Sequence, residues 1–238
     1  MAELSGFALL LPGGGCSRRF GGGNKLFAPL CGMPVFVRTI RTLAPLFPEN
    51  AVFMAVAPES LPEAEAAARR NLPEVPIRFI PGGATRTGSV RNLALAASEQ
   101  GGFDFIAIHD AVRPLIRPEV VIAAAELCRR TGAAVVCRKV TDTLKQSADG
   151  AVIDGTVSRE CMWAAETPQM FRLSDFLGAS AEAEADGGVF TDDAQMMERF
   201  SGLRAGIVPD PYPNPKITFA EDLAFCRALL AEQDPICR

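Results

Sequence analysis

Two glycine-rich stretches that carry basic residues follow the first apolar run of the chain. Residues 8–30 read ALLLPGGGCSRRFGGGNKLFAPL, with Arg18 and Arg19 between the glycines and Lys25 after them. Glycine lets backbone N–H groups approach an anion closely, and clusters of such donors favour phosphate. Basic side chains in the same stretch would neutralise a polyphosphate directly. These residues predict a phosphate-binding loop, with a flexible, solvated surface loop as the alternative.

The spacing of these residues fits neither of the two common phosphate-loop motifs. The dinucleotide fingerprint G-x-G-x-x-G fails, because counting from Gly13 puts Arg18 at the third glycine and counting from Gly21 puts Leu26 there. The P-loop motif fails because Lys25 follows Asn24 and precedes Leu26, instead of standing in G-K-[ST]. The loop therefore belongs to another class of phosphate-binding loop, in which basic side chains of the loop itself supply positive charge.

Short apolar runs alternate with helical patterns through the first two thirds of the chain. We expect strands at 6–12, 51–57, 77–80, 103–109 and 133–140, and helices at 35–47, 62–71, 89–100 and 118–132. Apolar runs of this kind suit strands buried on both faces, so the pattern predicts an α/β fold with a doubly wound, mainly parallel sheet. Ligands bind at the carboxyl ends of such strands, which is where Gly13, Gly14 and Gly15 would lie.

The alternation weakens after Val140. Asp149-Gly150 and Asp154-Gly155 predict hairpin turns between short extended pieces, so 141–167 is expected to be a protruding β-arm on a single domain of residues 1–238. Further along we expect a helix at 192–200, a strand at 203–208, and a last helix that begins with a capping box.

That capping box pairs Thr218 with Glu221. The arm carries Val152, Ile153, Val157 and Met162, and a two-stranded arm could not bury these apolar residues alone.

The composition narrows the class of protein. A net charge of -4 with 48% hydrophobic residues argues against a broad nucleic-acid-binding surface. The apolar stretches are interrupted by Pro, Gly or Arg before they reach the length of a membrane span. With no signal-peptide pattern at residue 1, these features predict a cytoplasmic protein with neither a nucleic-acid nor a membrane partner.

The cysteines and the histidine limit the chemistry further. The seven cysteines form no C-x-x-C pair, so we expect reduced thiols. His109 is the only histidine, which leaves little for a histidine-rich zinc site or a Ser-His-Asp scheme. A hard metal held by carboxylate and phosphate oxygens stays possible.

Seven blocks of sequence carry a resemblance to a known family. They are, in order, LLPGGGCSRRFGGGNKLF, GGATRTGSVRNLA, IHDAVRPLI, VTDTLK, TVSRECMWAAETPQMF, FTDDAQMME and NPKITFAEDLA. In order and spacing the chain resembles the 2-C-methyl-D-erythritol 4-phosphate cytidylyltransferases from about residue 6 to 230. It departs from them at Gly13 and Gly14, where alanines are usual, near Ser17, where a glycine is usual, and at Asn24, where a proline is usual.

The resemblance implies a Rossmann-like nucleotidyltransferase fold and a Mg²⁺-dependent reaction. Its partners would be CTP and a polyol phosphate, which give a CDP-alcohol and pyrophosphate. The incoming phosphate is already ionised, so the chemistry needs cations more than a general base. Ribitol 5-phosphate cytidylyltransferase, a sister family with the same blocks, and a non-catalytic nucleotide-binding module are the alternatives.

The resemblance also implies residue roles. Arg19 and Lys25 would stabilise the transition state, and Arg159 and Lys216 would hold the polyol phosphate. Asp110, at the end of the expected strand 103–109, would bind Mg²⁺. Candidate hydroxyl partners of the polyol are Thr143, Thr167 and Thr191. The expected nucleotide site comprises Pro12, Gly13, Gly14, Gly15, Gly82, Arg86, Ser89, Asp110, Ala111 and Arg113.

Three further residues of these blocks have a structural interpretation. We expect His109 to be structural, and Asp192 and Asp193 to cap a helix. For Arg86, a structural clamp and a role at the nucleotide are equally open.

In the family the arm packs against the same arm of a second subunit, so the resemblance implies a homodimer in which Arg159 can reach the partner's site.

Overall fold

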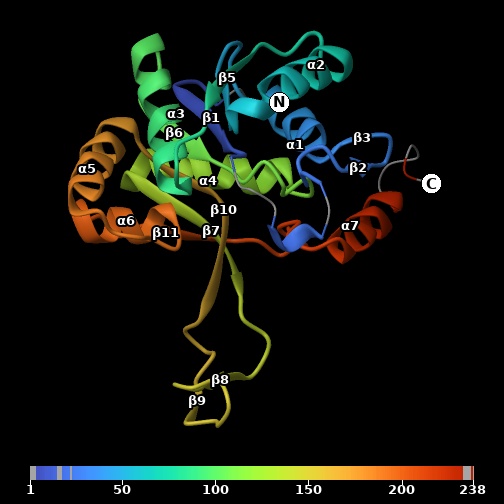
Figure 1. Cartoon of the computed structure of the whole chain (residues 1–238). Coiled ribbons are helices and arrows are strands. Elements are labelled where there is room, and N and C mark those ends of the chain that lie inside the picture. Colours follow the sequence, from blue (N-terminus) through green and yellow to red (C-terminus); the bar gives the residue numbers. More distant parts are fainter. Residues whose placement is uncertain (1–3, 15–17, 22, 233–236, 238) are drawn as a thin grey trace.

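The computed structural model describes residues 4–14, 18–21, 23–232 and 237. Its centre is a seven-stranded sheet in the order β11-β7-β10-β6-β1-β4-β5. The strands are β1 (Phe7–Pro12), β4 (Val52–Val56), β5 (Ile77–Pro81), β6 (Phe105–Ile108), β7 (Ala133–Lys139), β10 (Trp163–Arg172) and β11 (Gly206–Pro209). The predicted α/β class with a mainly parallel sheet is confirmed (Figure 1).

Helices cover both faces of this sheet. They are α1 (Val35–Leu43), α2 (Leu61–Asn71), α3 (Arg86–Gln100), α4 (Pro118–Thr131), α5 (Leu173–Asp186), α6 (Asp193–Phe200) and α7 (Glu221–Ala231). Short 3-10 turns lie at η1 (Arg18–Phe20), η2 (Ala44–Leu46) and η3 (Pro58–Ser60). Within the described residues, no helix combines the length and the apolar composition needed to cross a bilayer.

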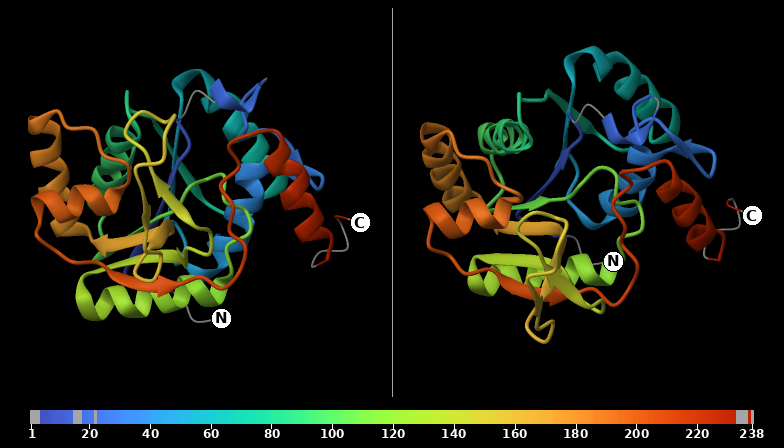
Figure 2. Two further views of the ribbon diagram at one scale, coloured as in Figure 1. Left: turned by 90° about the horizontal axis from the view of Figure 1, so that it is seen from below. Right: turned by 60° about the horizontal axis from the view of Figure 1, so that its bottom comes forward.

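The strands are apolar on both faces because two separate cores form. Leu9 and Leu11 of β1 pack with α1, α2, α4 and α7, whereas Ala8 and Leu10 pack with α3, α5 and α6. Successive side chains of a strand point to opposite faces, so a strand that lies between two apolar cores needs a continuous apolar run. Figure 2 shows α5 and α6 on one side of the molecule and α1, α2 and α7 on the other.

Strand β10 is the exception to the parallel arrangement. It runs antiparallel to both neighbours, with Gln169 opposite Ile108 of β6 and Val135 of β7. The sequence pattern did not predict this strand or α5, which follows it. Glu166, Thr167 and Gln169 are polar residues buried inside β10, and they interrupt the apolar run by which a central strand is recognised.

The protruding β-arm lies between β7 and β10 (Figure 1). Its tip is one hairpin of β8 (Leu144–Gln146) and β9 (Gly155–Val157). The predicted turn at Asp149-Gly150 is present, since Gly150 has a φ of 72° and Asp149 accepts from the N–H groups of Ala151 and Val152.

The second predicted turn of the arm is wrong. Gly155 begins β9, and the Asp154 carboxylate accepts a hydrogen bond from Ala148 N–H, so it closes the same loop. The chain re-enters the sheet at Trp163, which pairs with Lys139 inside the segment expected to be arm.

The start of the last helix also differs from the prediction. Helix α7 begins at Glu221, and it is the Asp222 carboxylate that accepts from the N–H groups of Thr218 and Phe219. The capping box of Thr218 and Glu221 is wrong, because the accepting carboxylate stands one residue later than the pattern requires.

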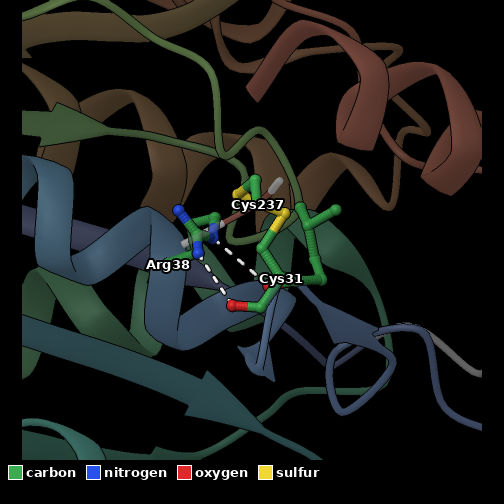
Figure 3. Close-up of a disulfide and its surroundings, with 4 residues drawn as sticks. Cys31, Arg38 and Cys237 are labelled. Carbon is green, nitrogen blue, oxygen red and sulfur yellow. Dashed lines mark hydrogen bonds between the residues drawn. A yellow bond between two sulfur atoms is a disulfide. The ribbon is translucent and has the colours of Figure 1, made fainter. Parts of the chain in front are cut away.

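A disulfide joins Cys31, in the turn between β2 (Pro29–Leu30) and β3 (Met33–Pro34), to Cys237 beyond α7 (Figure 3). Arg38 of α1 donates to the carbonyl oxygens of Leu30, at 3.3 Å, and Cys31, at 3.0 Å, which fixes this turn. The expectation of reduced thiols is wrong for this pair, because helix α7 returns the chain to a turn 206 residues earlier. Free thiols are present at Cys128, Cys137, Cys161 and Cys226.

Candidate functional site

A cavity of about 320 Å³ lies where β1, β5 and β6 reach their carboxyl ends. Pro12 ends β1, Gly83 lies two residues beyond β5, and Asp110 lies two residues beyond β6. This is the edge at which open α/β sheets bind ligands. The described residues that line the cavity are Pro12, Gly13, Gly14, Lys25, Leu26, Gly83, Ala84, Thr85, Arg86, Ser89, Asp110, Val112 and Lys216.

Backbone rather than side chains forms one wall of the cavity. A Cβ atom at Gly13 would stand 2.9 Å from the Ala55 carbonyl oxygen, and one at Gly83 would stand 2.8 Å from the backbone carbon of Gly88. Both distances are shorter than real Cβ contacts, so in this chain a side chain at either position would force the facing backbone to move.

The amides of this wall are already used by the protein. Gly13 N–H donates to Ala55 O at 2.7 Å, Gly82 N–H donates to Val56 O at 2.8 Å, and Gly83 N–H donates to Ser89 Oγ at 3.0 Å. Ser89 in turn donates to Thr85 O at 2.9 Å. Ser89 therefore holds the loop in shape, which the sequence pattern did not reveal.

Asp110 is the centre of a charged cluster beside the cavity. Its Oδ2 atom lies 3.0 Å from Lys216 Nζ and 3.2 Å from Arg113 Nε, and its Oδ1 atom lies 3.6 Å from Arg86 Nη2. Burial alone would raise the pKa of Asp110, but Lys216, Arg86 and Arg113 hold it well below its usual range. Asp110 is an ionised carboxylate that brings three cations together.

Arg86 is held by a second acid. Its Nη1 atom lies 2.7 Å from Asp193 Oδ2, and Asp193 is almost fully buried. Burial would lower the pKa of Arg86, but Asp193 and Asp110 raise it above its usual value.

Of the two acids at the start of α6, Asp192 is the cap predicted from the sequence, since it accepts from Gln195 N–H at 2.9 Å. Asp193 is an ion-pair partner instead.

Lys25 reaches the cavity from the glycine-rich loop. Its Nζ donates to Ile217 O at 3.0 Å, next to Lys216. Burial, reinforced by the charge of Lys216, lowers the pKa of Lys25. Asn24, which stands where a proline is usual in the family it resembles, accepts a hydrogen bond from Leu26 N–H at 3.1 Å and so shapes the turn.

Arg19 approaches the same region from η1. Its guanidinium carbon lies 6.0 Å from the centre of the Phe219 ring, in the segment between Lys216 and α7. The structure therefore brings the loop cations toward the segment that carries Lys216. Gly15 lies outside the described residues.

His109 is part of the scaffold beneath Asp110. Its Nε2 lies 3.0 Å from Arg113 O, an acceptor, so Nε2 carries the proton and Nδ1 accepts from Thr167 Oγ at 3.1 Å. Thr167 Oγ also accepts from Asp110 N–H at 3.2 Å. Burial lowers the pKa of His109 to about 4, so the ring is neutral at pH 7.

The other predicted site residues fall into two groups. Ala111 is buried directly after Asp110, and its carbonyl accepts from Thr39 Oγ at 2.9 Å. Thr143 and Arg159 lie exposed on the arm, where Arg159 donates to Thr141 O, and neither lines the cavity of its own chain. Thr191 is exposed and donates to Gln195 Oε1 at 3.1 Å.

Asn214 was missed by the sequence analysis. It is fully buried, and its side-chain Nδ2 donates to Glu166 Oε2 at 3.1 Å and to Thr167 O at 3.0 Å. Its backbone carbonyl accepts from Arg113 Nη1 at 2.6 Å. Asn214 thus orients Arg113 toward Asp110. Its place in the block NPKITFAEDLA, two residues before Lys216, is the sequence feature that could have marked it as a site residue.

Comparisons with known proteins agree over nearly the whole chain. Residues 7–232 match the family model described as 2-C-methyl-D-erythritol 4-phosphate cytidylyltransferase. Proteins of that name from Acidobacterium capsulatum and Deinococcus radiodurans are 36% and 39% identical; the alignments cover 94% and 95% of this chain and 97% and 90% of theirs. The crystal structure of the Thermus thermophilus protein of that name has a TM-score of 0.77 and 28% identity, and the match covers 97% of this chain and 100% of that one.

Proposed function

Because the chain belongs to the 2-C-methyl-D-erythritol 4-phosphate cytidylyltransferase family, we propose that the cavity beside Asp110 binds CTP and is the place of the reaction. Membership of this family makes the chain an enzyme of isoprenoid biosynthesis that acts on CTP and 2-C-methyl-D-erythritol 4-phosphate. The two alternatives kept open by the sequence, a ribitol 5-phosphate enzyme and a non-catalytic module, have no counterpart among these relatives. The cytoplasmic location stays a prediction.

The charge of the cavity is the observation that carries this proposal. Among the described residues that line it, Lys25, Arg86 and Lys216 are cationic and Asp110 is the one carboxylate. A cavity of about 320 Å³ with an excess of positive charge suits a nucleoside triphosphate. The backbone wall of Gly13, Gly14 and Gly83 supports a flat base lying close to the main chain. With the amides of Gly13 and Gly83 already bonded, base selection here would rely on other groups, carbonyl oxygens among them.

The reaction is an in-line displacement at the α-phosphorus of CTP. A phosphate oxygen of the polyol phosphate forms the new P–O bond while the bond to pyrophosphate breaks. The attacking phosphate is ionised at neutral pH and needs no general base, which agrees with a buried, neutral His109. Lys25 and Arg19 supply positive charge where negative charge accumulates, and a bound triphosphate would favour the charged form of Lys25.

The residues of the site fit a Mg²⁺ ion only if the nucleotide is bound as well. Within the part of the chain that the structure describes, no group of three or more His, Cys, Asp or Glu side chains could hold a metal alone. Asp110 would supply one carboxylate, and Mg²⁺ commonly takes its other ligands from substrate phosphates and water. When bound there, the ion would supply positive charge to the triphosphate.

The polyol phosphate would lie between Lys216 and a partner's arm. Lys216 lines the cavity next to Asp110, whereas Arg159 and Thr143 are exposed on the arm of the same chain. The arm exposes Val152 by 64% and Ile153 by 62%, and an isolated two-stranded hairpin is only marginally stable in water. We therefore assign the arm to a homodimer in which Arg159 and Thr143 serve the neighbouring site.

Pyrophosphate release with CTP tests the assignment of the cavity. Replacing Lys25 by Ala should lower kcat by roughly 10²-fold, because the lost charge acts chiefly in the transition state. Arg69→Ala, which removes an exposed cation of α2 that contacts Glu65, is the matched control and should leave the rate unchanged. UTP should be a poor substrate. A Lys25→Ala effect confined to KM, or equal kcat/KM for CTP and UTP, would contradict the proposal.

A further inference from the structure

The two acids at the start of α6 have different partners. Asp192 caps the helix by accepting from Gln195 N–H, so the cap position is already filled. Asp193 is 1% exposed and points to Arg86, which begins α3 on another part of the chain. A carboxylate with so little access to water is costly unless a charged partner compensates it. The arrangement therefore couples α6 to the wall of the cavity.

Gln169 of β10 fixes the backbone on both sides of Asp193. Its Nε2 donates to Asp192 Oδ2 at 2.9 Å, and its Oε1 accepts from Ala194 N–H at 3.0 Å. Gln169 is itself buried and pairs with Ile108 of β6, two residues before Asp110. The Asp193 carboxylate is thus set relative to the strand that presents Asp110.

Arg86 lies between these two carboxylates and is closer to Asp193. The distance from Nη1 to Asp193 Oδ2 is 2.7 Å, and that from Nη2 to Asp110 Oδ1 is 3.6 Å. Asp110 already has Lys216 and Arg113 within 3.2 Å. A cation at the amino end of a helix also meets the positive end of the helix dipole, so Arg86 depends on its acids to stay in place.

We propose that Asp193 is a positioning residue for the nucleotide site, acting through Arg86. Asp193 does not line the cavity, whereas Arg86 and Asp110 both do. Without the charge of Asp193, Asp110 is the remaining acid that Arg86 contacts, and its guanidinium would be drawn toward Asp110 and into the cavity. Asp193 holds Arg86 at the wall and leaves Asp110 to Lys216 and Arg113. This inference rests on the proposed CTP site.

A double-mutant cycle in the full-length enzyme tests this inference. Asp193→Asn, Arg86→Ala and the double variant are compared by steady-state pyrophosphate release. Asp193→Asn should raise KM for CTP by about tenfold or more, as expected for a lost charged hydrogen bond, with KM for the polyol phosphate changed less than about twofold. In the Arg86→Ala background the same substitution should have no further effect on CTP, because the group through which it acts is gone.

The matched control removes a different acid from an ion pair with α3. Glu184→Gln takes away the partner of Arg91 on α3, a pair at 3.1 Å that lies outside the cavity, and should change neither KM. Melting temperature monitors folding of every variant. If Asp193→Asn does not fold, Asp193→Ser takes its place, since serine keeps one acceptor without the charge.

Two results would overturn the inference. One is a folded Asp193 variant whose KM for CTP stays within about twofold of the parent; the other is a loss that adds in full to that of Arg86→Ala, as a purely structural role predicts. Failure of the proposed function gives a different pattern. In that case Arg86→Ala itself leaves KM for CTP unchanged, and the role of Asp193 falls with it.

Discussion

The buried histidine makes the stability of this enzyme sensitive to mild acid. His109 is 0% exposed, donates through Nε2 to a carbonyl and accepts through Nδ1 from Thr167, so the native protein holds it neutral. Its pKa is about 4 in the folded protein, against an ordinary value of 6.5. Below pH 6.5 the unfolded chain binds a proton that the folded chain does not. Stability therefore falls as the pH drops from 6.5, and the loss is complete below about pH 4.

The size of the effect follows from the two pKa values. A difference of roughly 2.5 units corresponds to about 3.4 kcal/mol between neutral pH and pH below about 4. At about pH 5 the loss is about 2 kcal/mol, a large share of the stability of a typical domain. Glu166, Asp193 and Asp210, whose pKa values are raised by burial, act in the opposite direction above about pH 4. A comparison with a histidine variant removes their contribution.

Denaturant unfolding at about pH 7.5 and about pH 5 measures the loss of unfolding free energy in acid. The parent should lose about 2 kcal/mol more than His109→Gln, in which an amide supplies a donor and an acceptor without titrating. Because His109 is the only histidine of the sequence, its ring C2–H (Hε1) gives one NMR signal that no other histidine overlaps. That signal should titrate near pH 4. A midpoint near 6.5, or equal losses in both proteins, would refute the reasoning.

Two further experiments probe the metal and the dimer. Asp110→Asn should raise the Mg²⁺ concentration needed for half-maximal activity, and excess Mg²⁺ should restore part of the rate; superimposable titration curves would show that Asp110 is no ligand. Arg19→Ala and Arg159→Ala subunits, each inactive alone, should regain about a quarter of the parental activity after dissociation and random reassociation, because half of the dimers are mixed and one site in each is intact. If Arg159 serves its own chain, the mixture stays inactive.

The parallel part of the fold could be predicted because its signals are local. Each expected strand from 6–12 to 133–140 overlaps an observed one, since a strand buried on both faces needs a continuous apolar run. β10 gives no such run, because it carries Glu166, Thr167 and Gln169 into the centre of the sheet. Their hydrogen-bond partners come from other elements, so no window of sequence reveals that they are buried.

The residues of the candidate site could likewise be predicted only where their signals are local in the sequence. The glycines, Lys25, Asp110 and Lys216 stand in recognisable blocks, and the structure brings them together. Asp193 has the sequence neighbourhood of a helix start, which predicts a cap. Its real partner, Arg86, is 107 residues away, a pairing that depends on the finished fold.

The wall built from main chain has a consequence for how this enzyme could escape an inhibitor. Enzymes commonly acquire resistance by replacing a side chain that the drug touches. Here a compound lying against Gly83 would touch peptide groups, whose chemistry no substitution alters. Even one added methyl group at Gly83 would stand 2.8 Å from the Gly88 backbone carbon, so the substitution that displaces the drug also distorts the pocket. Resistance at the Gly83 part of this wall would cost turnover, which makes it a durable surface for drug design.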